Sequence, residues 1–150
     1  MESDISTAKI TSIIGSQFPK IVIPKIDEAK TSIKIVVFDW RWYPNDIGNP
    51  CQLFNQSIVR ASGRGVRVSV ITNNGDIISI LQSVGVKAQK LITKNLVHAK
   101  LMIIDDKVVI IGSHNYSQSA FTMNYEVSSM FEDADSAKVF SDFFSNLYGL

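Results

Sequence analysis

The sequence predicts an α/β fold, in which a mixed, largely parallel β-sheet is flanked by helices on both faces. Short apolar runs rich in Val and Ile alternate with helix-like stretches in the first half of the chain, as they do in proteins with parallel sheets. In the second half, two apolar runs flank a polar turn, which predicts a hairpin. The 150 residues suit one domain of ordinary size, so we expect a single domain over residues 1–150.

In the first half, strands are expected over residues 33–39 and 66–71, because both runs are short, apolar and β-branched. A helix-like stretch precedes the first strand and has Pro24 near its first turn, where proline is tolerated. Helices are also expected over residues 50–62 and 76–84, since each stretch is followed by a glycine that can end it.

In the second half, residues 101–104 and 108–111 should pair as a hairpin about the turn Asp105-Asp106-Lys107. Residues 125–131 alternate and predict another strand. The chain should close with a helix over residues 133–147, whose apolar side chains lie on one side. These side chains are Val139, Phe140, Phe143, Phe144 and Leu147.

The composition is that of a globular protein without a membrane segment. No window approaches the roughly 18 to 20 apolar residues of a membrane span, so no stable membrane insertion is expected. Residues 1–11 lack the basic and apolar regions of a secretory signal, which favours a cytoplasmic location, although an exported protein that has been trimmed would look the same. Cys51 is the only cysteine and cannot form an intrachain disulfide.

The charged residues are unevenly distributed, although the formal net charge is only +1. Residues 60–107 contain eight basic and three acidic side chains, whereas residues 108–150 contain one basic and five acidic side chains. A basic middle segment can attract a polyanion such as nucleic acid, but a solvated face with scattered lysines would give the same count.

The segment from His98 to Asn115 is the most informative chemically. Side chains of a strand alternate between faces, so a strand that begins by His98 places His98 and Lys100 on one face and Asp105 on the other. The hairpin then returns Ser113 and Asn115 near the first face. An imidazole, a cation, a hydroxyl and an amide in one patch suit an anionic phosphoryl group.

Each of these residues alone has an ordinary structural explanation. A single histidine at a strand edge is usually a satisfied surface or core residue, and a lysine near it is usually solvated. An aspartate in a hairpin usually belongs to the turn, which is the main role that we expect for Asp105. The joint spacing between two apolar strands is far more specific than any one residue.

The string H-x-K-x(4)-D-x(6)-G-S-x-N, with a glutamate eleven residues after the asparagine, resembles the signature of the phospholipase D superfamily. Chain length and the order of elements are similar to those of its small single-motif nucleases, which have one motif per chain. The residues that match are His98, Lys100, Asp105, Gly112, Ser113 and Asn115, with Glu126 as the glutamate. Asp105 thereby joins the candidate catalytic residues.

The resemblance implies a phospholipase D-like fold, a metal-independent phosphodiesterase and a role for each residue. His98 would attack phosphorus and form a phosphohistidine, while the histidine of a second motif protonates the leaving oxygen. Lys100 and Asn115 would hold the phosphoryl oxygens with support from Ser113. Glu126 would accept a hydrogen bond from His98. No metal and no other cofactor is expected.

The number of histidines predicts a homodimer. The chain has only His98 and His114, and the implied mechanism needs two histidines at one site. His114 occupies the variable position of G-S-x-N and is offset by one from the converging face, so it should point away. A symmetric homodimer would bring two copies of His98 together.

Three classes of function remain open: a nuclease acting on DNA or RNA, a phospholipase or phosphatidyl transferase, and an inactive binding module. The complete motif disfavours the third, and the basic segment favours a nuclease. Trp40, Trp42 and Tyr43 follow the end of a strand, where ligands tend to bind, and Trp40 and Trp42 are candidate substrate contacts. These aromatics could stack on bases, lie at a membrane surface or pack on a dimer partner.

Overall fold

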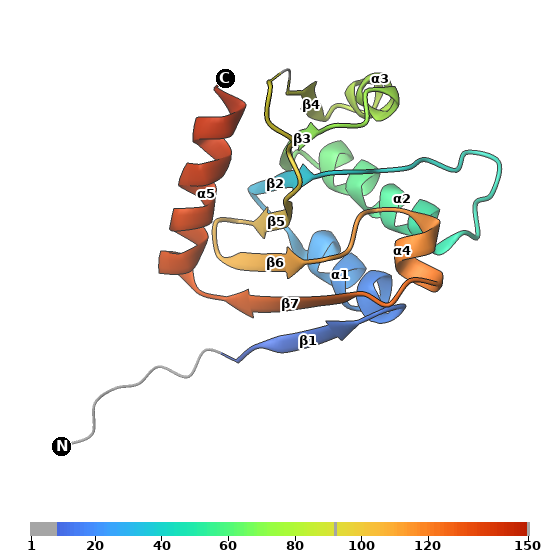
Figure 1. Ribbon diagram of the computed structural model, residues 1–150, viewed down its shortest axis with the longest axis horizontal. Helices are drawn as coiled ribbons and strands as arrows, with labels where there is room; N and C mark the ends of the chain where they lie inside the picture. Colours follow the sequence, from blue (N-terminus) through green and yellow to red (C-terminus); the bar gives the residue numbers. More distant parts are fainter. Residues whose placement is uncertain (1–8, 92, 150) are drawn as a thin grey trace.

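The computed structural model describes residues 9–91 and 93–149. One seven-stranded sheet, in the order β1-β7-β6-β5-β2-β3-β4, runs through the molecule (Figure 1). In chain order the elements are β1 (Thr11–Ile14), α1 (Gln17–Glu28), β2 (Ser32–Val37), α2 (Pro50–Gly63), β3 (Arg67–Thr72), α3 (Asp76–Ser83), β4 (Lys87–Lys90), β5 (Lys100–Ile104), β6 (Val108–Gly112), α4 (Gln118–Thr122), β7 (Val127–Glu132) and α5 (Ala134–Tyr148).

The sheet is mixed but mostly antiparallel, so the prediction of a largely parallel sheet is wrong. Only the β2–β3 and β3–β4 pairs are parallel. The pairs β1–β7, β7–β6, β6–β5 and β5–β2 are antiparallel. Three residues join β5 to β6, and so short a connection permits only antiparallel pairing.

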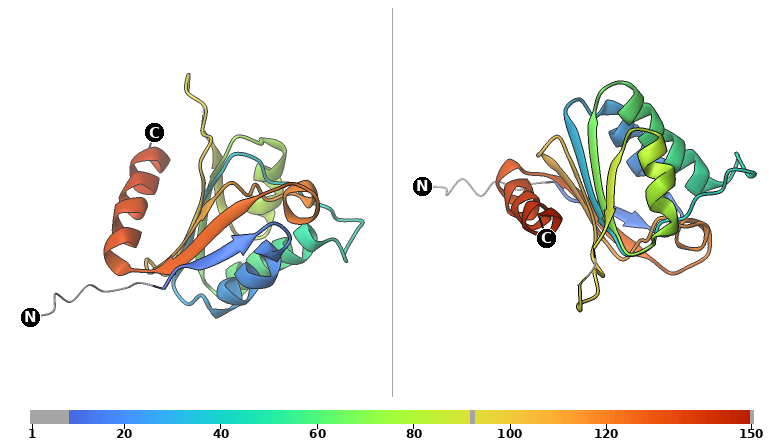
Figure 2. Two further views of the ribbon diagram at one scale, coloured as in Figure 1. Left: turned by 60° about the horizontal axis from the view of Figure 1, so that its bottom comes forward. Right: turned by 90° about the horizontal axis from the view of Figure 1, so that it is seen from above.

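Helices cover both faces of the sheet, as predicted. Figure 2 shows α5 on one face and α1, α2 and α3 on the other. The side chains of β5 alternate between these layers: Met102 and Ile104 belong to the core under α1 and α2, whereas Leu101 and Ile103 belong to the core under α5. This alternation confirms the face assignment expected for β5. The β6 half of the hairpin differs from the prediction, because the register puts position 114, and not 113 or 115, on the face of Lys100.

Helix α1 corrects the prediction for the N-terminal part of the chain. It begins at Gln17, so Pro24 lies inside the helix rather than in its first turn. Phe18, Val22 and Ile26 recur every four residues and are buried. Burial of such side chains is worth about 1.5–3 kcal/mol each, which outweighs the roughly 3 kcal/mol cost of an interior proline.

Capping explains where α2 and α5 begin. Asn49 accepts a hydrogen bond from the Cys51 N–H at 2.8 Å, and Pro50 occupies the first position of α2, where its missing N–H costs nothing. Asp133 accepts one from the Ser136 N–H at 3.0 Å at the start of α5. These boundaries agree with the predicted ones to within two residues, whereas β1, β4 and α4 were not predicted.

Candidate active site

The candidate site lies at one edge of the sheet, where β2, β3 and β6 end and β5 begins. The strand register places Lys100 opposite Val37, and Leu101 opposite Ile111. The loops that follow β2 and β6 therefore meet the segment that precedes β5. Five of the predicted site residues lie on these loops or strand ends: His98, Lys100, Ser113, Asn115 and Glu126.

His98 and Lys100 form the centre of the site. His98 is exposed just before β5, and Lys100 is the first residue of that strand. Lys100 Nζ lies 3.2 Å from each ring nitrogen of His98. The Phe38 ring packs beside both, 5.1 Å from the His98 ring and 5.7 Å from Lys100 Nζ. The backbone just before His98 is held in place, because Asn73 Nδ2 donates a hydrogen bond to the Val97 carbonyl.

Lys100 supplies a positive charge beside the imidazole. Partial burial lowers the pKa of the Lys100 ammonium, and the nearby Glu126 carboxylate acts in the opposite direction. A partly dehydrated ammonium attracts a phosphoryl oxygen more strongly than one in bulk water.

Ser113 and Glu126 are bound to each other rather than to His98. Ser113 Oγ donates to Glu126 Oε1 at 2.5 Å and accepts from the Val127 N–H at 3.0 Å. The other carboxylate oxygen of Glu126 accepts from Asn124 Nδ2 at 3.1 Å. Within the part of the chain that the structure describes, no hydrogen bond joins Glu126 to His98, so the expected contact between these two residues is absent.

Gly112 allows this close approach of β6 and β7. A Cβ atom at Gly112 would overlap the side chain and backbone of Ser128, which is its partner across the strands. The glycine of the G-S-x-N string is therefore required by strand packing.

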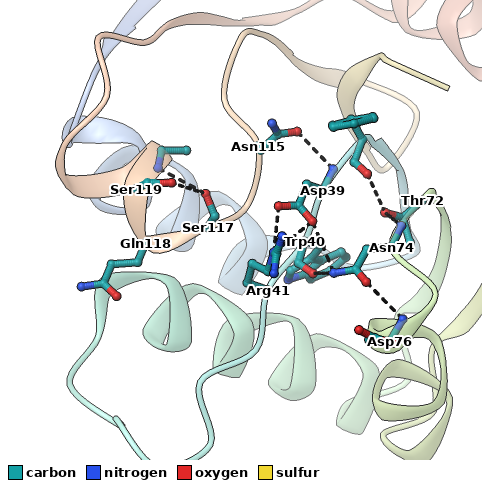
Figure 3. Close-up of polar contacts among 12 residues, drawn as sticks. Asp39, Trp40, Arg41, Thr72, Asn74, Asp76, Asn115, Ser117, Gln118 and Ser119 are labelled. Carbon is teal, nitrogen blue, oxygen red and sulfur yellow. Dashed lines mark hydrogen bonds and ion pairs between the residues drawn. The ribbon is translucent and has the colours of Figure 1, made fainter. Parts of the chain in front are cut away.

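Asn115 is oriented by the segment that follows β2. Its Oδ1 accepts a hydrogen bond from the Asp39 N–H at 3.1 Å (Figure 3). The neighbouring backbone is held as well, since the Tyr116 N–H donates to the Asp39 carbonyl at 3.0 Å and the Arg41 N–H donates to the Tyr116 carbonyl at 2.8 Å. With its oxygen engaged, Asn115 can present its amide N–H groups to a ligand.

Phe38, Asp39 and Asn73 were not among the predicted site residues. These residues belong to no recognisable motif. Only their position could have predicted them, because each follows a buried strand at the edge that carries the motif.

His114 points away from the site, as predicted. It is 1% exposed, and its Nε2 lies 2.9 Å from the Gly15 carbonyl and its Nδ1 lies 2.7 Å from Ser128 Oγ. A carbonyl only accepts, so Nε2 donates and Nδ1 accepts from the serine hydroxyl. Burial lowers the pKa of His114, while the Gly15 contact and Glu126 act in the opposite direction.

Asp105 lies at the other end of β5 from Lys100. Its carboxylate accepts hydrogen bonds from the N–H groups of Lys30, Thr31 and Ser32 and from the Thr31 hydroxyl, at 2.8–3.2 Å. Partial burial alone would raise the pKa of Asp105, but these hydrogen bonds lower it overall. Asp105 thus ties the β5–β6 turn to the start of β2, far from the other motif residues.

The structure corrects the expected role of Trp40. Its side chain is fully buried, and its indole Nε1 donates to Asn55 Oδ1 at 2.7 Å, so it has no surface to offer to a substrate. Trp42, two residues later, packs against the same core but is partly exposed. Trp42 remains a candidate substrate contact.

The eight basic residues between 60 and 107 do not form one basic face. Arg60 pairs with Asp27 at 3.1 Å, and Arg64 donates to the carbonyls of Ile26 and Ala29. Lys90, which ends β4, and Lys100, which begins β5, lie at the edge that carries the site.

A cluster of metal ligands and a helix able to span a membrane are both absent from the described residues, 9–91 and 93–149. No three His, Cys, Asp or Glu side chains gather there as a set of metal ligands. None of the helices there is both long and apolar enough to cross a membrane.

A family model described as "Cardiolipin synthase, PLD-like domain" matches residues 22–148. Mouse mitochondrial cardiolipin hydrolase is 29% identical over 126 residues, which cover 80% of this chain and 53% of that protein. A phospholipase D of Rickettsia bellii is 27% identical over 143 residues, which cover 90% of this chain and 67% of that protein. The chain spans about half the length of the mammalian relatives.

The fold also matches a solved structure. The phospholipase D family member Nuc from Salmonella typhimurium superposes with a TM-score of 0.78 at 21% identity, over 94% of this chain and 95% of that one.

Proposed function

The chain belongs to the phospholipase D-like family of phosphodiesterases, and on this premise we propose that it hydrolyses phosphodiester bonds of DNA or RNA at a site shared by two subunits. The observation that carries the proposal is the pairing of the exposed His98 imidazole with Lys100 Nζ at 3.2 Å, beside an oriented Asn115.

The proposed reaction proceeds in two steps. A ring nitrogen of His98 attacks phosphorus, the P–N bond forms, and the P–O bond to the leaving alkoxide breaks. The leaving oxygen takes a proton from His98 of the partner subunit, because an alkoxide is too basic to leave alone. Water then attacks phosphorus and gives its proton to His98 of the partner subunit. The P–N bond breaks and releases the His98 that carried the phosphoryl group. Lys100 and Asn115 hold the phosphoryl oxygens throughout.

The second histidine must come from another chain. His114 is buried and both its ring nitrogens are engaged, so it is not free to act as the acid. Two copies of His98 can approach only if the surfaces around them meet. That surface includes a groove of about 300 Å³ beside His98, flanked by Leu96 and Phe143, which are 65% and 46% exposed. Burial of such side chains would stabilise a dimer.

Nucleic acid is the favoured substrate because cations and donors extend beyond the one phosphate that the motif binds. Lys90 is in register with Thr72, Thr72 with Val37, and Val37 with Lys100. Lys90 and Lys100 therefore lie three strand spacings apart along one edge, which is roughly 14 Å. A polyanionic strand can contact both lysines.

A lipid phosphodiester is the second candidate, and the names of the relatives favour it. The experiment that separates the two presents single-stranded DNA, RNA, plasmid and phosphatidylglycerol vesicles in parallel, with a chelator in excess. We expect cleavage of nucleic acid, undiminished by the chelator and steeply inhibited by salt. Cleavage of the lipid alone would refute the nuclease proposal, and dependence on an added divalent ion would refute the metal-free mechanism.

A further inference from the structure

A hollow of about 210 Å³ lies beside the motif, between the segment that follows β2 and the start of α3. Its polar and aromatic lining comes from Arg41, Trp42, Asn74 and Asp76, over Ile77, Ile80 and the buried Trp40. The mechanism described above makes no use of this hollow.

One short segment connects the hollow to the catalytic motif. Phe38 packs against His98, and the Asp39 N–H donates to Asn115. Arg41, two residues after Asp39, lines the hollow. Three residues of extended chain span at most about 11 Å, so the hollow lies next to the place where His98 and Asn115 would hold a phosphoryl group.

Some polar groups of this region already form hydrogen bonds within the protein, and others are available to a ligand (Figure 3). Asn74 is engaged, since its Nδ2 donates to Asp39 and to the Trp40 carbonyl and its Oδ1 accepts from the Asp76 N–H. The Arg41 Nε donates to both oxygens of Asp39 at 2.9–3.1 Å. Its terminal amino groups have no hydrogen-bond partner among the described residues, and its side chain is 59% exposed.

The chemistry of the lining indicates what the hollow accepts. The charge of Arg41 is offset by Asp39 and Asp76, so the hollow has no excess positive charge to hold a second phosphate. Its charged rim disfavours an acyl chain. A guanidinium and an indole both offer flat surfaces on which nucleobases stack, and the carboxylate and amino groups can bind the polar edge of a base.

We propose that this hollow is the subsite for the base next to the scissile phosphate of a single-stranded nucleic acid, with Arg41 and Trp42 as its binding residues. This inference rests on the proposed nuclease function. It makes the enzyme prefer substrates that carry a base at that position.

Abasic substrates test the subsite directly. An oligonucleotide with an abasic residue stepped through the positions around the cleavage site keeps every phosphate but loses one base at a time. We expect the wild type to lose about tenfold in kcat/KM at one position next to the cut, since base stacking on aromatic side chains has about this effect. Arg41→Ala and Trp42→Leu should abolish that preference and should act mainly on KM.

Arg60→Ala is the matched control, because Arg60 is similarly exposed and also pairs with an aspartate, but on the far side of α2. It should leave the preference unchanged. If Arg41→Ala slows base-containing and abasic substrates equally, Arg41 acts by supporting Asn115 and the subsite is refuted. If the wild type cleaves oligonucleotides without any preference for a base, the subsite also fails while the nuclease function stands. If it cleaves only vesicles, the nuclease function itself fails.

Fluorescence gives a second measurement that does not depend on cleavage. The chain contains two tryptophans, and the fully buried Trp40 also borders the hollow, so the emission of Trp42 is measured as the difference between the protein and its Trp42→Leu variant. Single-stranded oligonucleotide added to His98→Ala protein should quench the Trp42 emission, and abasic oligonucleotide should not. Equal quenching by both, or quenching by phosphatidylglycerol vesicles alone, would contradict the proposal.

Discussion

Lys100 and Asp105 belong to one sequence motif but occupy opposite ends of β5, so their removal should have different consequences. Lys100 borders His98, whereas Asp105 binds the backbone of residues 30–32. The sequence already predicted that Lys100 and Asp105 lie on opposite faces, and the structure adds the backbone groups that Asp105 binds.

Lys100→Ala should reduce kcat without unfolding the protein. Loss of one charged group that stabilises the transition state costs about 100- to 1000-fold in kcat. Lys100 is only partly buried and makes no ion pair within the described residues, so the free energy of unfolding should change by less than about 0.5 kcal/mol. Steady-state kinetics and urea unfolding of this variant, beside the surface variant Lys138→Ala, measure both quantities.

Asp105→Asn should show the opposite pattern. The variant can keep the contacts of Oδ1 but loses the charge, and its amide group would face the Lys30 N–H that Oδ2 now accepts, which should cost about 1–3 kcal/mol of stability. Asparagine tolerates the positive φ of 54° at this position, so the substitution adds little strain. Normal stability together with a large loss of kcat would instead place Asp105 among the catalytic groups.

The same carboxylate makes stability depend on acid. Because the folded pKa of Asp105 is lowered, its contribution is present above the unfolded value of about 3.9 and is lost as pH falls through the folded pKa. The stability difference between wild type and Asp105→Asn, followed by urea unfolding, should therefore shrink as pH falls below about 4. A difference that stays constant down to the lowest pH would contradict this assignment.

At the residue scale the sequence predicts the types and much of the placement of the site residues. Strand parity correctly put Lys100 on the face opposite to Leu101 and Ile103. It gave the wrong reason for His114, because the register places position 114 on the face of Lys100, and burial against Phe18 withdraws the ring from the site. It could not predict that Glu126 binds Ser113, because the conformations of a loop and a strand end decide that contact. It also could not distinguish the buried Trp40 from the partly exposed Trp42, since neighbouring aromatics look equivalent without the core.

At the scale of elements, His114 joins three parts of the chain. It sits in the loop after β6, contacts Ser128 in β7 and Gly15 between β1 and α1, and its ring lies 4.6 Å from that of Phe18. The edge strand β1 is therefore attached through a buried side chain as well as through backbone pairing.

His114→Phe should weaken this attachment and flatten its pH dependence. Phenylalanine keeps the ring packing but leaves Ser128 and the Gly15 carbonyl without partners, which should cost about 1–3 kcal/mol at pH 7.5. The folded pKa of His114 is lowered, so its contribution is present above the unfolded value of about 6.5 and is lost as pH falls below it. Thermal unfolding between pH 5 and 7.5 measures this, and an unchanged slope in the variant would contradict the assignment.

Element types were predictable to a large extent, whereas strand direction was not. Apolar periodicity located β2, β3, β5, β6 and β7, because it reports which side chains are buried. It carries no information on whether neighbouring strands run in the same direction, and β5 lies beside β2 through long-range pairing. The strands β1 and β4 escaped prediction because each has four residues and few buried side chains.

At the scale of the whole molecule, each chain holds half of the proposed site. We propose a second copy of this chain as the source of the acid, because His98 is exposed beside a groove whereas His114 is buried. Light scattering at micromolar concentration should therefore give twice the mass of the 16.7 kDa chain. A stable and fully active monomer would refute the shared site.

Dimers that pair one wild-type chain with one His98→Ala chain, purified through two different affinity tags, test the shared site most directly. Lys100 and Asn115 remain in both chains, so substrate should still bind. A site with only one His98 can supply the nucleophile or the acid but not both. We therefore expect almost no turnover. If the mixed dimer instead keeps about half of the wild-type rate, each subunit works alone and the shared site is wrong.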